Sequence, residues 1–101
     1  MADAQLKKRL LAAAKKPCNF VLAMKGADVA LILSVRAISG GQVKEVKDRI
    51  KGGKVYRGVL EGGSNGYVFK ADAALPTASV GALRNYIKSE TGLTIRISLN
   101  S

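Results

Sequence analysis

The dipeptide Asn65-Gly66 constrains the fold of this chain more than any other feature, because it separates two short runs in which apolar and polar residues alternate. Asn-Gly is the strongest short signal for a β-hairpin turn, and as a two-residue loop it sets Ser64 opposite Tyr67. Counting outward from this loop pairs Glu61 with Lys70 and assigns every second residue to one face. The face assigned to the core carries Tyr56, Leu60, Phe69 and Ala71. The face assigned to solvent carries Arg57, Val59, Glu61, Val68, Lys70 and Asp72.

The residues before this hairpin predict a helix followed by another hairpin. Apolar residues recur at helical spacing over residues 3–16, where Asp3 can cap the first turn and Pro17 stops the helix. Residues 19–36 then contain two β-rich runs on either side of a turn at residues 25–28. We therefore expect an N-terminal basic amphipathic helix and a largely buried pair of strands.

Two further helices and a last strand complete the expected order. Ser39 and the glutamine three residues after it have the spacing of a capping box, which begins a helix that ends at Lys51. The next helix begins at Pro76 and ends at Gly92, and residues 93–99 then alternate as a strand. The order is α-β-β-α-β-β-α-β.

This order predicts an α+β protein, with a predominantly antiparallel sheet and helices packed on one face. A shift of 37 residues aligns the apolar stripe of the helix after Ser39 with that of the helix after Pro76, as a ββα pseudo-repeat would. Any amphipathic helix that follows a strand offers such matches, so two unrelated helices remain the alternative.

The length of 101 residues predicts a single compact domain over residues 1–101, with the N-terminal helix at 3–16 and a sheet-and-helix core at 19–99. Cys18 is the one cysteine, which rules out an intramolecular disulfide and fits a reducing compartment. The longest strongly apolar run, residues 29–35, is far too short to cross a bilayer. We expect a cytoplasmic protein with no transmembrane segment.

The net charge is the unusual global property of the chain. Seventeen Lys and Arg residues against seven Asp and Glu residues give +10, with no histidine. Such a charge favours an anionic partner. Nucleic acid is the partner that we favour, and an acidic protein or self-association are the alternatives.

Candidate binding side chains lie in the basic stretch between Lys44 and Gly58. Within it, Lys44 with Asp48 and Glu45 with Arg49 stand at i, i+4 spacing, which is typical of a solvated helix. The basic residues of this stretch without such a partner are Lys47, Lys51, Lys54 and Arg57. The N-terminal helix adds Lys7, Lys8 and Arg9. Plain solvated surface is the alternative interpretation of both sets.

A second candidate is an anion site at the strand-to-helix turn, formed by Ser39, Gly40 and Gly41. Its glycines leave the first helical amides uncovered, as phosphate-binding turns do. Helix capping by Ser39 is the alternative, because no phosphate-loop lysine follows at the required spacing.

The composition argues against catalysis. Histidine is missing, and Cys18 lacks the imidazole that most often activates a thiol. Metal sites need clustered Cys, His or carboxylate side chains. This chain has one cysteine, no histidine and seven acids that are scattered along the sequence. We therefore expect no catalytic residues, no metal site and no cofactor.

The sequence thus predicts a small, basic, non-catalytic binding module. Sequence-independent contact with the phosphate backbone of nucleic acid is the favoured function, because aromatic residues for base stacking are few. The alternative is a protein–protein interaction or dimerisation module whose charge only aids solubility and steering. In that case a sheet edge such as residues 93–99 pairs with a partner or with a second copy.

Overall fold

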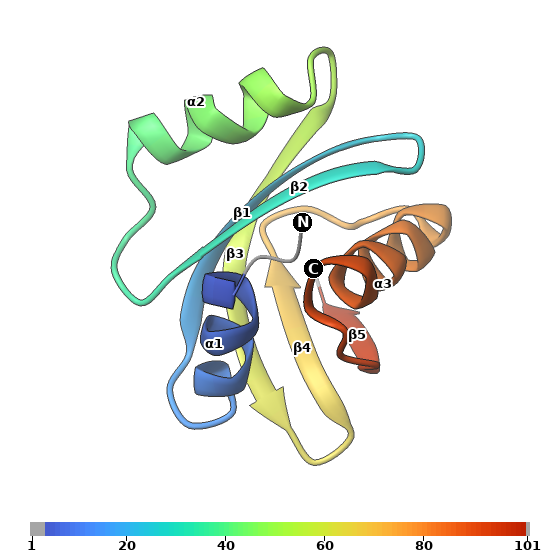
Figure 1. Cartoon of the computed structure of the whole chain (residues 1–101). Helices are drawn as coiled ribbons and strands as arrows, with labels where there is room; N and C mark the ends of the chain where they lie inside the picture. The colour runs from blue at the N-terminus through green and yellow to red at the C-terminus, as the bar shows by residue number, and fades with distance from the viewer. Residues whose placement is uncertain (1–3, 101) are drawn as a thin grey trace.

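The computed structural model describes residues 4–100, which form a five-stranded sheet and three helices with their connecting loops (Figure 1). The α+β class and the predicted element order are confirmed. The elements are α1 (Ala4–Ala13), β1 (Cys18–Lys25), β2 (Asp28–Ser34), α2 (Gly40–Arg49), β3 (Lys54–Gly63), β4 (Gly66–Ala71), α3 (Thr77–Thr91) and β5 (Ile97–Asn100).

The strands lie in the order β2-β1-β3-β4-β5, which leaves β2 and β5 at the two edges. Neighbouring strands are antiparallel except β5, which runs parallel to β4. The parallel pair follows from α3, because a parallel neighbour requires a crossover connection, which a helix commonly supplies.

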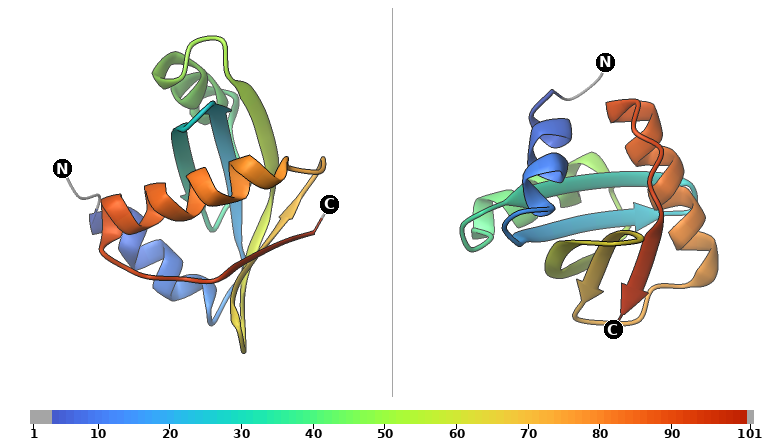
Figure 2. Two further views of the ribbon diagram at one scale, coloured as in Figure 1. Left: turned by 90° about the vertical axis from the view of Figure 1, so that its right-hand side faces the viewer. Right: turned by 90° about the horizontal axis from the view of Figure 1, so that it is seen from below.

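Helices α1 and α3 cover one face of the sheet and enclose the larger core. Phe20 of β1 and Phe69 of β4 meet there edge to face, with ring centroids 5.2 Å apart. Leu10 of α1 and Leu83 and Ile87 of α3 pack onto them and are fully buried. In Figure 2, the view from below shows these two helices on one side of the strands.

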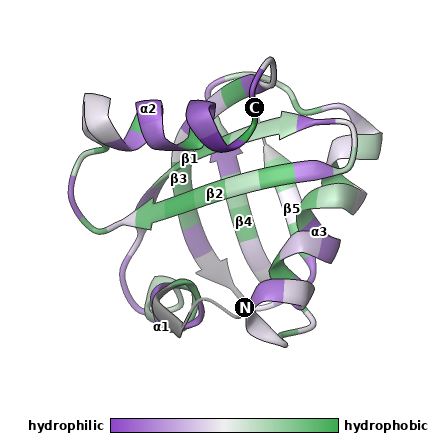
Figure 3. Ribbon diagram, turned by 45° about the horizontal axis from the view of Figure 1, so that its top comes forward, coloured by the Kyte–Doolittle hydropathy of each residue, from purple (hydrophilic) through white to green (hydrophobic). Residues whose placement is uncertain are grey.

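Helix α2 covers the opposite face, so the three helices do not share one face as the sequence analysis expected. Its Val46 is fully buried against Val21 and Ala23 of β1 and Ala30 of β2. The reason lies in β1, which is apolar on both faces and therefore needs cover on both. Figure 3 shows hydrophobic residues along β1 and β2 and hydrophilic ones along much of α2. The two ββα units thus place their helices on opposite faces, which is not the arrangement of a simple repeat.

The β3–β4 hairpin has the predicted faces but not the predicted register. Leu60 pairs with Phe69, and Gly63 pairs with Gly66 across the turn, a shift of two residues from the expected pairing. No described non-glycine residue has a positive φ, so Asn65 does not adopt the left-handed conformation that a type I′ Asn-Gly turn requires. Gly66 takes the positive φ instead, at 117°. An even shift keeps every side chain on its predicted face.

The first helix ends earlier than its sequence pattern suggested. Helix α1 stops at Ala13, and the backbone then turns at Ala14 because the residue before Pro17 is disfavoured in helix. A Cβ on Gly62 would lie only 2.4 Å from Ala14 Cα, so glycine at this position lets the end of α1 touch β3. The expected cap Asp3 lies outside the described residues.

The bounds of α2 and β5 also differ from the predicted ones. Helix α2 stops at Arg49 rather than Lys51, and α3 ends as predicted, with Gly92 in the left-handed conformation. Strand β5 is Ile97–Asn100, so it begins four residues after the start of the expected run at 93–99 and ends one residue beyond it. Within residues 4–100 no helix has the length and apolar character needed to cross a bilayer.

Candidate nucleic-acid interface

The start of α2 is built as a helix cap. The Ser39 hydroxyl accepts a hydrogen bond from the Gln42 amide at 3.2 Å, and the Gln42 side chain accepts one from the Ser39 amide at 2.9 Å. This confirms the predicted capping box and explains why helix begins here. The cap accounts for Ser39, Gly40 and Gly41 on structural grounds, and an anion at this turn stays a prediction.

The two acids of α2 are both engaged with bases of the same helix. Lys44 Nζ lies 2.8 Å from Asp48 Oδ2, and Arg49 Nη2 lies 2.6 Å from Glu45 Oε2. The hydrogen bond to Asp48, and then its charge, raises the pKa of Lys44. The i, i+4 pairs expected from the sequence are therefore formed, and these acids are already occupied by other bases.

Two lysines from different elements, Lys25 and Lys51, come together where α2 ends. Lys25 closes β1, and its Nζ lies 3.5 Å from the position that a Cβ on Gly52 would occupy. Lys51 shares a surface cleft with Lys25. Lys54 pairs with Met24, the residue before Lys25, so its backbone lies beside Lys25, but its side chain leaves the face of the sheet that α1 and α3 cover. All three side chains are exposed.

Lys47 extends this group along α2, because it stands one helical turn before Lys51 and is also exposed. We call Lys25, Lys47, Lys51 and Lys54 the basic cluster. No ion pair joins a cluster lysine to any acid within residues 4–100. Asp28 lines the same cleft and is the backbone partner of Lys25 in the hairpin.

Arg57 lies apart from the basic cluster, although the sequence grouped it with Lys54. Arg57 pairs with Val21 on the face that α2 covers, and it does not line the cleft that Lys25 and Lys51 share. Arg57 lines a groove with Asn19, Val59 and Asp72. Its amide donates to Asp72 Oδ1 at 3.2 Å, which keeps a carboxylate beside it.

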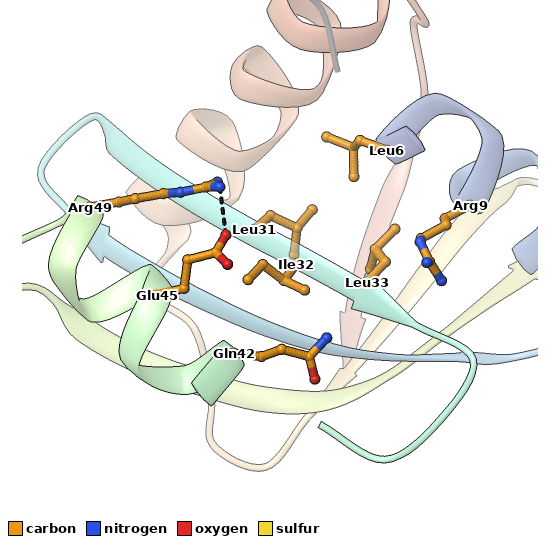
Figure 4. Close-up of a pocket in the computed structure, with 8 residues that line it drawn as sticks. All are labelled: Leu6, Arg9, Leu31, Ile32, Leu33, Gln42, Glu45 and Arg49. Carbon is orange, nitrogen blue, oxygen red and sulfur yellow. Dashed lines mark hydrogen bonds and ion pairs between the residues drawn. The ribbon is translucent and has the colours of Figure 1, made fainter. Parts of the chain in front are cut away.

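The basic residues of α1 are on the other side of the sheet from α2. Lys7 and Lys8 are exposed and Arg9 is half-buried. The structure therefore does not bring Lys7 and Lys8 onto one surface with the basic cluster. Arg9 instead approaches α2 across the β2 edge, where it shares a groove with Arg49 (Figure 4).

Lys25 is the member of the cluster that the sequence analysis missed. The sequence does indicate a turn directly after it. Its proximity to Lys54 depends on the pairing of β1 with β3, which are separated by α2 in the chain. Local patterns carry no information on that long-range pairing.

The potential metal ligands of the described residues do not converge, and the one thiol is buried. Within residues 4–100 no group of three or more His, Cys, Asp or Glu side chains converges. Cys18 is buried; burial raises the pKa of its thiol, and Arg9 opposes that shift. Its Sγ contacts the carbonyl oxygens of Arg9 and Lys16 at 3.9 Å.

The aromatic side chains belong to the core and its margin. Phe20, Phe69 and Tyr56 are buried, and Tyr67 and Tyr86 are partly buried against the same core. The basic cluster therefore has no aromatic side chain of the described residues within it on which a base would stack.

Comparisons with protein-family models, with curated proteins and with solved structures found no match to this chain. Its function is therefore argued from its own residues.

Proposed function

We propose that this protein is a non-catalytic module that binds nucleic acid through the phosphate backbone, independently of sequence, with the basic cluster as its contact surface. The observation that supports the proposal is the cleft that exposed Lys25 of β1 shares with exposed Lys51 after α2, with the exposed Lys47 one helical turn before Lys51 and the backbone of Lys54 beside the end of β1. None of them is paired with an acid of the described residues, while the acids of α2 pair with Lys44 and Arg49.

Backbone contact is the mode that this surface suits. Exposed lysines act as mobile point charges and neutralise phosphates, which releases condensed counterions. Each neutralised phosphate of a duplex contributes about 0.9 to the slope of log affinity against log salt. Base reading requires rigid hydrogen-bonding or stacking groups, and the cluster supplies neither.

The proposal is tested by fluorescence anisotropy of labelled duplex DNA, single-stranded DNA and RNA between about 50 and 200 mM salt, where counterion release is measurable. We expect log-linear weakening with salt for the unmodified chain. The double variant Lys51→Ala/Lys54→Ala is expected to lower the slope by about 2, because two phosphate contacts are lost.

A charge-matched control separates the cluster from net charge. Arg84→Ala/Lys88→Ala removes the same charge from exposed positions on α3, which packs on the face of the sheet opposite α2. This variant, and Arg57→Ala, should keep the original slope to within about 0.5, because neither removes a cluster contact. Equal losses in all variants, or no binding at the lowest salt, would contradict the proposal.

A further inference from the structure

Strand β2 is an edge of the sheet that lies at the bottom of a groove. Within residues 4–100 it pairs only with β1. Helix α1 stands on one side of this edge and α2 on the other (Figure 4). A groove of about 240 Å³ runs between them, lined by Leu6, Arg9, Leu31, Ile32, Leu33, Gln42, Glu45 and Arg49.

The backbone groups that face this groove follow from the hairpin geometry. Lys25 pairs with Asp28 across a two-residue turn, so this pair exchanges hydrogen bonds and the pairs beyond it alternate. The amides and carbonyls of Val29, Leu31 and Leu33 therefore point away from β1. No backbone hydrogen bond from elsewhere in residues 4–100 reaches them. An added strand could therefore pair with the free backbone amides and carbonyls of these three residues.

The two edges of the sheet differ in how they are protected against strand addition. Natural edge strands are commonly short, or carry charges, proline or bulges. Strand β5 is short, at four residues, and follows Arg96. Strand β2 has seven residues, DVALILS, with a single charge at its first position and no proline. Its side chains after Asp28 are buried or partly buried by the helices, so the features that discourage pairing are missing at this edge.

The charged side chains around the groove favour an acidic occupant. Arg9 stands on the α1 side and makes no ion pair with an acid of the described residues. Arg49 stands on the α2 side and binds Glu45 through Nη2, which leaves its other guanidinium donors for a second carboxylate. A second copy of a chain with a net charge of +10 would bring like charges together here, whereas an acidic segment would meet opposite ones.

We propose that an extended acidic peptide adds as a strand to β2, in the groove between α1 and α2. Its backbone pairs with Val29, Leu31 and Leu33, and its side chains alternate between the two walls. On the α1 side they meet Leu6 and Arg9. On the α2 side they meet Ile32, Gln42 and Arg49. This interaction uses a different surface from the basic cluster and does not depend on nucleic-acid binding.

The probe is a fluorescent peptide of about eight residues, a common strand length, in which pairs of Glu alternate with pairs of Val, so that each wall of the groove meets both residue types. Its matched control has the same sequence and charge but carries N-methyl groups on alternate backbone nitrogens, which removes the amide donors of one edge. We expect the control to bind about tenfold more weakly or worse, because several backbone hydrogen bonds are lost. Equal binding of the two peptides would mean attraction by charge alone and would overturn the proposal.

Site-specific measurements locate the contact. Amide hydrogen exchange at Leu31 and Leu33 should slow about tenfold or more when the peptide binds, because these amides become hydrogen-bonded. Arg9→Ala should weaken binding roughly threefold to tenfold, while Arg84→Ala should not, because Arg84 lies on α3 away from the groove. Lys51→Ala/Lys54→Ala should leave peptide binding within about twofold, which keeps this test distinct from that of the basic cluster.

Two other outcomes would reject the acidic peptide as the occupant. If light scattering shows a dimer whose Leu31 and Leu33 amides are already protected without peptide, a second copy fills the edge. If these amides stay unprotected at saturating peptide, the peptide binds elsewhere.

Discussion

The two faces of the sheet are covered very unequally. On the face beneath α1 and α3, both helices contribute fully buried side chains, which meet the Phe20–Phe69 pair. On the other face, α2 contributes one buried residue, Val46, with partly buried neighbours around it. The two faces therefore contribute differently. The α1–α3 face supplies most of the buried apolar side chains, while α2 buries one side chain and carries exposed charges.

The largest expected effect is on the well-covered face. Phe69→Ala should lower the free energy of unfolding by about 3–5 kcal/mol, because it removes a fully buried ring and leaves a cavity beside Phe20. Urea denaturation followed by circular dichroism measures this loss. A loss below about 1 kcal/mol would mean that this face is not the main core.

The corresponding truncation on the other face should cost less. Val46→Ala should lower the free energy of unfolding by about 2 kcal/mol, since two methyl groups leave a site enclosed by Val21, Ala23 and Ala30. The same denaturation experiment gives the comparison directly. If Val46→Ala proves as costly as Phe69→Ala, the two faces contribute equally and the proposed division fails.

A smaller effect is expected at the start of α2. Ser39→Ala removes the hydroxyl that accepts from the Gln42 amide and should cost about 1 kcal/mol, whereas Ser39→Thr, which keeps a hydroxyl, should cost a fraction of that. Neither variant should change the salt slope of nucleic-acid binding. If Ser39→Thr loses affinity for nucleic acid while its stability is kept, the anion site predicted at Ser39–Gly41 becomes the better explanation.

Features coded by neighbouring residues were predicted well from the sequence. The cap at Ser39, the i, i+4 pairs of α2 and the left-handed Gly92 all involve groups a few residues apart. The β3–β4 register was displaced by two residues because the Asn-Gly pattern indicated a turn but not its type.

Features that depend on strand order were beyond the sequence patterns. A strand that is apolar on both faces, such as β1, does not indicate which helix covers which side. The placement of Lys54 beside the end of β1, and the separation of Lys7 and Lys8 from the cleft at Lys25 and Lys51, follow from the order β2-β1-β3 and from the placement of α1. The groove at β2 is likewise visible only once α1 and α2 are placed on opposite sides of that strand.

The most direct test of the division between a stabilising face and a binding side is amide chemical-shift mapping of the isotope-labelled protein during titration with a short DNA duplex. The account predicts shifts concentrated at residues 25–28 and 47–54, which surround the basic cluster, with few changes in α1 and α3. Shifts centred on Lys7, Lys8 and α3, or spread evenly over all basic residues, would contradict it.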